Sequence, residues 1–165
     1  MTSHVEIDGW KNSICFSASH LITGHKKCGQ LHGHTYAIHA KIYGEKNKDD
    51  IILDFSTIKK LLREIAEELD HKTLIPEKNN AVTILIKEKK VEISANNKKY
   101  VLPLEDCVLI PFSFTTAENL AEHVLNRLIE KIRLAENIKK IEICIDEGVG
   151  QGAGIEKMLD QEHET

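Results

Sequence analysis

The most regular pattern along the chain is an alternation of apolar and polar residues between positions 32 and 43. Neighbouring side chains of a β-strand point to opposite faces, so this alternation predicts a strand with one buried face. One face would carry Thr35, Ala37, His39 and Lys41. The other face would carry His32, His34, Tyr36, Ile38, Ala40 and Ile42.

Shorter segments also have a strand-forming composition. Residues 5–18 predict a strand with a polar interruption near Asp8 and Gly9, and residues 141–146 alternate isoleucine with polar residues. Residues 82–102 predict an inserted β-hairpin region, because two β-prone runs there are separated by a polar turn. The apolar runs at residues 100–102 and 108–110 are expected to pair with these two strands.

Two segments have apolar residues spaced three and four apart, as in an amphipathic helix. They are residues 56–69, where Asp54 or Ser56 could cap the start, and residues 116–133. Strands outnumber helices and do not alternate with them. We therefore expect an α+β fold with an antiparallel sheet, in a single domain over residues 1–165.

The amino-acid composition bears on nucleic-acid binding, membrane insertion, secretion and disulfide formation. The chain has 22 basic and 26 acidic residues, so no basic excess indicates nucleic-acid binding. No apolar run is long enough for a transmembrane helix, and the N-terminus lacks the features of a secretory signal. The four cysteines are far apart and form no CxxC pair. We expect reduced thiols and a cytoplasmic location.

Six of the nine histidines lie within the first forty residues. The His-Gly-His sequence at 32–34 places two imidazoles on one side of the predicted strand, about 7 Å apart at the backbone. His20 could supply a third, and three neutral imidazoles are a recurrent catalytic zinc set. A lone motif of this kind also occurs by chance on exposed strands. His25 and His39 are expected to be solvated.

Cys28 precedes this motif in a loop that also contains Lys26 and Lys27. Nearby cations and a bound zinc ion would favour the thiolate, which could act as a general base. Alternatively, Cys28 is a fourth zinc ligand that closes the site and leaves a structural metal. The sequence is compatible with both roles.

Carboxylates at two further positions could take part in chemistry. Asp70 precedes His71 directly after the first predicted helix, and an Asp can orient a His for proton transfer. The alternative is a favourable interaction of His71 with the C-terminal end of the helix. Glu147 ends the last predicted strand and could accept two parallel N–H groups of a pterin-like ring, or be an ordinary solvated residue.

These motifs, taken in order, resemble the family of 6-pyruvoyltetrahydropterin and 6-carboxytetrahydropterin synthases. The resemblance runs from about residue 5 to about residue 150 and is specific as a set, although no single motif would be sufficient. The matching stretches are residues 16–20, 28–36, 53–55, 69–71 and 116–121, and Glu147.

The resemblance implies a T-fold, in which a four-stranded antiparallel sheet carries two helices on one face. It also implies a homohexamer of two trimers with active sites at subunit interfaces, and a pterin triphosphate substrate. By position, it implies the zinc ligands His20, His32 and His34, the thiolate base Cys28, and the proton-transferring pair Asp70 and His71. It further implies the pterin anchor Glu147 and the pocket-lining residues Thr116, Ala117 and Glu118.

The spacing of the Cys–His motif helps to choose a branch of the family. Three residues separate Cys28 from His32, which is typical of the branch that makes 6-carboxytetrahydropterin for 7-deazaguanines such as queuosine and archaeosine. The 6-pyruvoyl branch usually has five, and a folate-pathway branch has Glu in place of Cys. The resemblance therefore implies a zinc-dependent lyase that converts 7,8-dihydroneopterin triphosphate into 6-carboxytetrahydropterin, acetaldehyde and triphosphate.

Two alternatives remain open, and two features depart from the family pattern. The alternatives are a 6-pyruvoyl product from the same substrate and a non-catalytic zinc- or pterin-binding oligomeric protein. The chain between His71 and Pro111 is longer than in compact members, and Gly148 follows Glu147 where Thr is frequent. These departures are expected to affect the mouth of the pocket, the contacts between subunits and the binding of the pterin.

Overall fold

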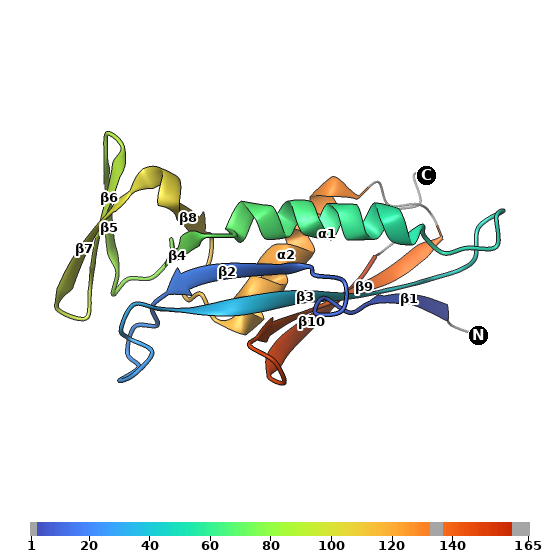
Figure 1. The fold of residues 1–165 in the computed structure, drawn as a ribbon, viewed down its shortest axis with the longest axis horizontal. Helices are drawn as coiled ribbons and strands as arrows, with labels where there is room; N and C mark the ends of the chain where they lie inside the picture. Colours follow the sequence, from blue (N-terminus) through green and yellow to red (C-terminus); the bar gives the residue numbers. More distant parts are fainter. Residues whose placement is uncertain (1–2, 133–136, 160–165) are drawn as a thin grey trace, which may run out of the picture.

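The computed structural model describes residues 3–132 and 137–159, and its largest element is a seven-stranded sheet (Figure 1). The sheet includes the alternating strand predicted from residue 32, which confirms that prediction. The single strand predicted over residues 5–18 is wrong, because a turn divides this segment into two strands. In spatial order its strands are β10 (Gly152–Met158), β9 (Ile138–Glu147), β3 (His32–Gly44), β2 (Cys15–His20), β4 (Lys72–Pro76) and β8 (Cys107–Ile110), while β1 (Ser3–Ile7) pairs with β3.

The sheet is mixed, which corrects the expected four-stranded antiparallel arrangement. Strands β10, β9, β3 and β2 are antiparallel neighbours, whereas β4 pairs in parallel with both β2 and β8. The chain passes through helix α1 (Phe55–Leu69) between β3 and β4, so β4 enters the sheet parallel to β2. The α+β class is nevertheless as expected.

Helices α1 and α2 (Ala117–Lys131) cover one face of the sheet (Figure 1). Apolar side chains from both helices and from the inner face of β3 form one core, in which Leu62, Val124 and Ile38 are all 0% exposed. Asp54 caps α1 because its Oδ1 accepts a 2.7 Å hydrogen bond from the N–H of Ser56. Both helices are therefore close to their predicted bounds, although residue 133 lies outside the described residues.

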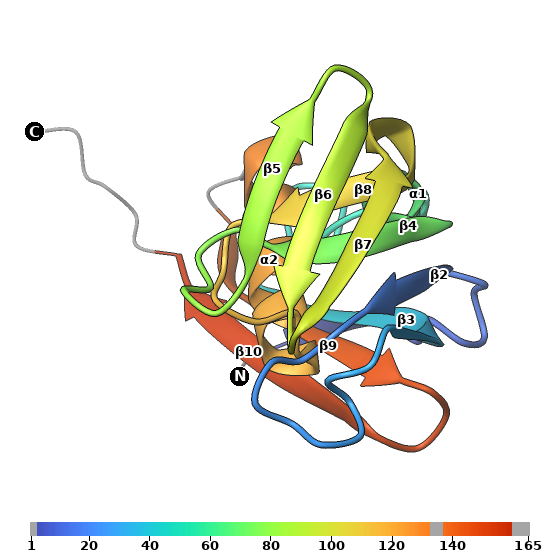
Figure 2. The same ribbon diagram turned by 90° about the vertical axis from the view of Figure 1, so that its left-hand side faces the viewer.

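A second, three-stranded sheet extends from one end of the molecule (Figures 1 and 2). It consists of β5 (Thr83–Lys87), β6 (Lys90–Ala95) and β7 (Lys98–Pro103), paired in that order. The predicted hairpin region is therefore a separate sheet. The expectation that residues 108–110 pair with it is wrong, because β8 follows a 3₁₀ turn (Leu104–Asp106) and joins β4.

The C-terminal strand β10 did not follow from the sequence, because its glycines give no strand signal. Gly148 and Gly150 adopt positive φ in the turn before it, and β10 then pairs with β9. Within the described residues, neither helix is long and apolar enough to cross a membrane.

Candidate active site

Three histidines from two neighbouring strands meet at one end of the large sheet. His20 is the last residue of β2 and lies opposite His32 in the register of β2 and β3. His34 lies two residues further along β3, on the same face. One ring nitrogen of each lies within 4.8 Å of the others, and the described residues contain no other such group of His, Cys, Asp or Glu. The fold thus assembles the histidines expected to bind a metal.

Two of these rings are oriented by main-chain carbonyl groups. His20 Nδ1 lies 2.8 Å from the carbonyl oxygen of Thr115, and His32 Nδ1 lies 2.7 Å from that of Gln30. A carbonyl oxygen can only accept, so Nδ1 carries the proton in both rings and Nε2 presents its lone pair. Histidines that bind a metal through Nε2 usually have such a partner on Nδ1.

The surroundings of His20 and His34 also fit a metal ion. Burial is the largest influence on the pKa of His20 and lowers it, which favours the neutral ring. Nε2 of His34 is buried and, within the described residues, has no hydrogen-bond partner. Oε1 of Glu147 lies 3.3 Å from this nitrogen, but two atoms that both present lone pairs cannot form a hydrogen bond, whereas a metal ion would satisfy an unprotonated Nε2. Three neutral imidazoles suit zinc with a fourth position open.

Glu147 faces the histidines from the end of β9. Its Oε1 lies 3.3 Å from Nε2 of both His20 and His34, and accepts a hydrogen bond of 3.2 Å from the hydroxyl of Tyr36. Burial raises the pKa of Tyr36 well above its ordinary value, so the hydroxyl stays protonated and donates. The carboxylate is thereby held beside the histidines, with a quarter of its side-chain surface exposed.

The histidines share a cavity of about 450 Å³ with Cys28 and Glu147. Cys28 is half-buried in the loop between β2 and β3. Its sulfur does not belong to the group of mutually close ligand atoms, which favours a base over a fourth metal ligand. The cavity is within the usual size range for small-molecule sites. The start of α2 contributes the other expected pocket residues, Thr116, Ala117 and Glu118.

Asp70 and His71 lie outside this cavity. Asp70 Oδ2 is 2.7 Å from Nδ1 of His71, and Asp70 Oδ1 accepts a 2.7 Å hydrogen bond from the N–H of Ser17. Desolvation raises the pKa of Asp70, but the hydrogen bonds from Ser17 and His71 outweigh it and hold the pKa below its ordinary value. The ring of His71 is 85% exposed. Within one chain, the structure does not bring this pair together with Cys28.

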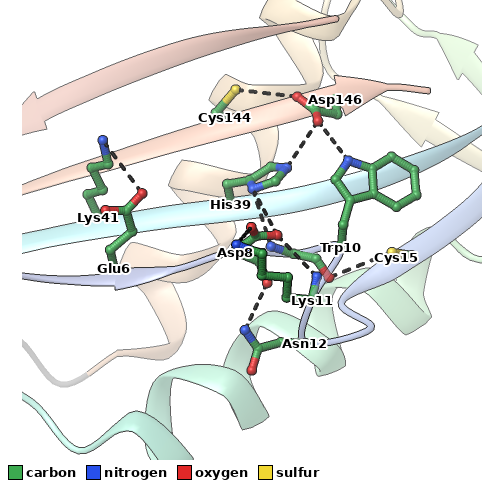
Figure 3. Close-up of polar contacts among 11 residues, drawn as sticks. Glu6, Asp8, Trp10, Lys11, Asn12, Cys15, His39, Lys41, Cys144 and Asp146 are labelled. Carbon is green, nitrogen blue, oxygen red and sulfur yellow. Dashed lines mark hydrogen bonds and ion pairs between the residues drawn. The ribbon is translucent and has the colours of Figure 1, made fainter. Parts of the chain in front are cut away.

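His39 lies on the opposite face of β3, and the expectation that it is solvated is wrong (Figure 3). Its Nδ1 accepts a 3.2 Å hydrogen bond from the N–H of Gly9, and its Nε2 lies 3.2 Å from Oδ2 of Asp146. The indole of Trp10 donates to the same carboxylate oxygen at 2.7 Å. These contacts tie the turn after β1 to β9. His25 is exposed, as expected, and lies at the edge of the cavity.

Three groups that contribute to the site, one hydroxyl and two carbonyl groups, were not predicted from the sequence. The hydroxyl of Tyr36 could have been suspected, because Tyr36 follows His34 by two positions and shares its strand face. The carbonyl groups of Gln30 and Thr115 leave no signal in the sequence, because the backbone of every residue offers the same carbonyl acceptor, whatever its side chain.

Comparison with known proteins places this geometry in a family. The family model described as 6-pyruvoyl tetrahydropterin synthase matches residues 11–157. A protein of Methanocaldococcus jannaschii, provisionally named 6-carboxy-5,6,7,8-tetrahydropterin synthase, is 38% identical over 159 residues, which cover 94% of this chain and 98% of that protein. A Haemophilus influenzae 6-carboxy-5,6,7,8-tetrahydropterin synthase is 30% identical over 139 residues, covering 73% and 86%.

Solved structures agree with the sequence relatives at the level of the family. The 6-pyruvoyltetrahydropterin synthase of Plasmodium vivax is 25% identical, with a TM-score of 0.89 and coverage of 96% of this chain and 99% of that chain. The enzyme of the same name from Plasmodium falciparum is 26% identical, with a TM-score of 0.88 and the same coverage.

Proposed function

Because the chain belongs to the 6-pyruvoyl tetrahydropterin synthase family, we propose that it is a zinc-dependent 6-carboxy-5,6,7,8-tetrahydropterin synthase. Its substrates are 7,8-dihydroneopterin triphosphate and one water molecule, and its products are 6-carboxytetrahydropterin, acetaldehyde and triphosphate. In this proposal the enzyme acts in the cytoplasm, in the pathway to 7-deazaguanines. The names of the sequence relatives and the three-residue spacing between Cys28 and His32 support this branch of the family.

The observation that carries the proposal is the set of three histidines beside Cys28 and Glu147 in one cavity. His20 and His32 present their Nε2 atoms because carbonyl groups hold their Nδ1 protons. These three imidazoles would hold a zinc ion and leave its fourth position open. A nearby thiol and a carboxylate then supply the base and the binding group that a pterin substrate needs.

The roles of the protein groups follow from their positions. When bound, zinc supplies a Lewis acid that makes a substrate hydroxyl more acidic. Glu147 accepts hydrogen bonds from the N–H groups of the pterin ring, and Tyr36 keeps the carboxylate in place. The Cys28 thiolate takes a proton from the substrate side chain. His71, oriented by Asp70, returns a proton before the triphosphate and acetaldehyde leave.

The proposal requires Asp70 and His71 to come from a neighbouring copy of the chain, because the cavity of their own chain excludes them. Strands β10 and β8 end the spatial order of the large sheet, and sheet edges can pair between copies. We therefore include a homohexamer with active sites at subunit interfaces. Mixing and reassembling inactive Cys28→Ala and His71→Ala proteins should restore part of the activity. Hybrids that stay inactive would contradict shared sites.

The second candidate is a 6-pyruvoyltetrahydropterin synthase that uses the same site. It is favoured by the two Plasmodium structures, which cover 96% of this chain. The 4% of this chain that is not covered corresponds to about seven of its 165 residues, which is fewer than strands β5–β7 contain. The similarity therefore extends into the three-stranded sheet of β5–β7, which we call the added sheet.

Product analysis tests the proposal. Zinc-loaded protein is incubated with 7,8-dihydroneopterin triphosphate, and the products are identified by mass spectrometry. We expect 6-carboxytetrahydropterin with acetaldehyde. A 6-pyruvoyl product would assign the second candidate. Folded, zinc-loaded protein without turnover would contradict both and favour a non-catalytic pterin-binding protein. A Cys28→Ala variant that binds zinc but retains full turnover would refute the role of Cys28 as base.

A further inference from the structure

The added sheet of β5–β7 contacts the loop between β2 and β3, which carries Cys28 (Figure 2). The turn between β6 and β7 reaches this loop through Asn96, whose Nδ2 donates a 2.8 Å hydrogen bond to the carbonyl oxygen of Gly29. Gly29 is the residue after Cys28. A residue of the added sheet is thus bonded to the backbone next to the proposed base.

Two further contacts hold the same loop. Asn79, just before β5, is 8% exposed and donates a 2.9 Å hydrogen bond to Oγ1 of Thr23. Leu21, at the start of the loop, packs into the small core of the added sheet together with Ile93 and Ala95. The loop is therefore attached to the added segment near its beginning, at Leu21 and Thr23, and again at Gly29, beside Cys28.

The loop itself is tightly folded around Cys28. The carbonyl group of Cys28 accepts a 2.7 Å hydrogen bond from the N–H of Ile22, and the N–H of Gly29 donates to the carbonyl group of His25 at 2.9 Å. A Cβ atom on Gly29 would overlap that carbonyl oxygen and lie 2.9 Å from Nδ2 of Asn96. Because Gly29 is packed this closely, a shift of the β6–β7 turn would be transmitted to Cys28.

Two asparagines, Asn96 and Asn97, form the turn between β6 and β7. Asn96 and Asn97 have φ values of 51° and 58° and connect two antiparallel strands, as in a two-residue type I′ hairpin turn. Asparagine tolerates this conformation well. Asn97 makes no hydrogen bond or ion pair within the described part of the chain, whereas Asn96 bonds to Gly29. The two residues therefore share a backbone role but differ in their contact with the loop.

We propose that the added sheet positions the Cys28 loop and that Asn96 is a positioning residue for Cys28. This inference rests on the proposed function, in which Cys28 is the base. Removal of the Asn96 side chain would loosen the backbone beside Cys28 and misplace its sulfur, while Glu147 and the three histidines would keep their places on the large sheet. The effect would therefore fall on the proton-transfer step rather than on pterin or zinc binding.

The test compares Asn96→Gly with the matched control Asn97→Gly. Glycine adopts positive φ without strain, so both variants keep the turn. We expect Asn96→Gly to lower kcat about two- to tenfold, which corresponds to the net free energy of one hydrogen bond, with KM and zinc content unchanged. Alkylation of Cys28 by iodoacetamide, followed by peptide mass spectrometry, should be faster by a similar factor. Asn97→Gly should match the wild type in both measurements.

Equal kcat and equal Cys28 alkylation in the two glycine variants would overturn the inference. A parallel loss of thermal stability and zinc content would also overturn it, because it would indicate a general structural role. Asn96→Asp, which keeps the shape but lacks the donor, should behave like Asn96→Gly. If the wild type does not turn over the pterin triphosphate, the proposed function fails, but the alkylation rates still decide whether Asn96 holds the loop.

Discussion

Replacement of Tyr36 by Phe removes one hydroxyl group from the site and little else. The ring is fully buried and stacks on Phe16 at a centroid distance of 4.8 Å, so Phe keeps the packing. The substitution removes the 3.2 Å hydrogen bond to Oε1 of Glu147 and the longer, 3.5 Å contact with Nε2 of His20. Because burial raises the pKa of Tyr36, the phenol is the donor throughout the working pH range, and the carboxylate is the acceptor.

The magnitude follows from the geometry of this bond. Hydrogen bonds to charged groups contribute about 1.5–3 kcal/mol, and 3.2 Å is long for an O–H donor, so the lower end applies. About 1.5 kcal/mol corresponds to roughly a tenfold effect. We expect Tyr36→Phe to raise KM for the pterin triphosphate about tenfold, with zinc content unchanged. Steady-state kinetics on zinc-loaded protein measure this effect.

A double-mutant cycle provides the control. If Tyr36 acts through Glu147, then Tyr36→Phe should change KM much less in a Glu147→Gln background than in the wild type, because coupled residues are not additive. Equal effects in both backgrounds would show that Tyr36 does not act through Glu147. An unchanged KM in the single variant would also show that the hydroxyl does not orient the carboxylate.

Three further predictions concern stability. Zinc at about 100 times its Kd should stabilise the protein by about 2.7 kcal/mol in thermal unfolding, and a chelator should remove this gain. The gain should be absent in His34→Ala, and an equal zinc effect in that variant would contradict the metal site. Desolvation raises the pKa of Glu68, but hydrogen bonds from Lys131 and Arg127 outweigh it and hold the pKa low. The resulting stability is present above about pH 4.3 and is lost as pH falls through the folded-state pKa, so Glu68→Gln should flatten the acid limb of denaturant-unfolding curves, and parallel limbs would refute this. Leu62→Ala should cost about 2–5 kcal/mol in urea unfolding because Leu62 is 0% exposed, and a cost below about 1 kcal/mol would contradict its core position.

The sequence predicted those parts of the fold whose pattern is local. The alternation from His32 to Ile42 identified β3, because the polarity of each residue in a strand depends on which face of the sheet its side chain occupies. Strand pairing is not local in this sense. The run at 108–110 is equally compatible with a hairpin partner or with β4, and only the path through the 3₁₀ turn selects β4.

The same distinction applies to the site. Residue type and spacing suggested the three histidines, the resemblance to the family implied Glu147, and the structure brings the four residues together. The carbonyl groups that orient His20 and His32 could not be identified, because they depend on where the backbone of Thr115 and Gln30 lies. The contact of Asn96 with Gly29 was hidden for a similar reason, since 67 residues separate the two and the turn has no catalytic signature.

X-ray absorption spectroscopy at the zinc edge, on zinc-loaded protein without substrate, tests the proposed metal site directly. We expect three imidazole nitrogens from His20, His32 and His34 at about 2.0–2.1 Å, with an oxygen in the remaining position and no sulfur. A sulfur shell at about 2.3 Å that disappears in Cys28→Ser would contradict it. Such a shell would make Cys28 a ligand of a closed structural site.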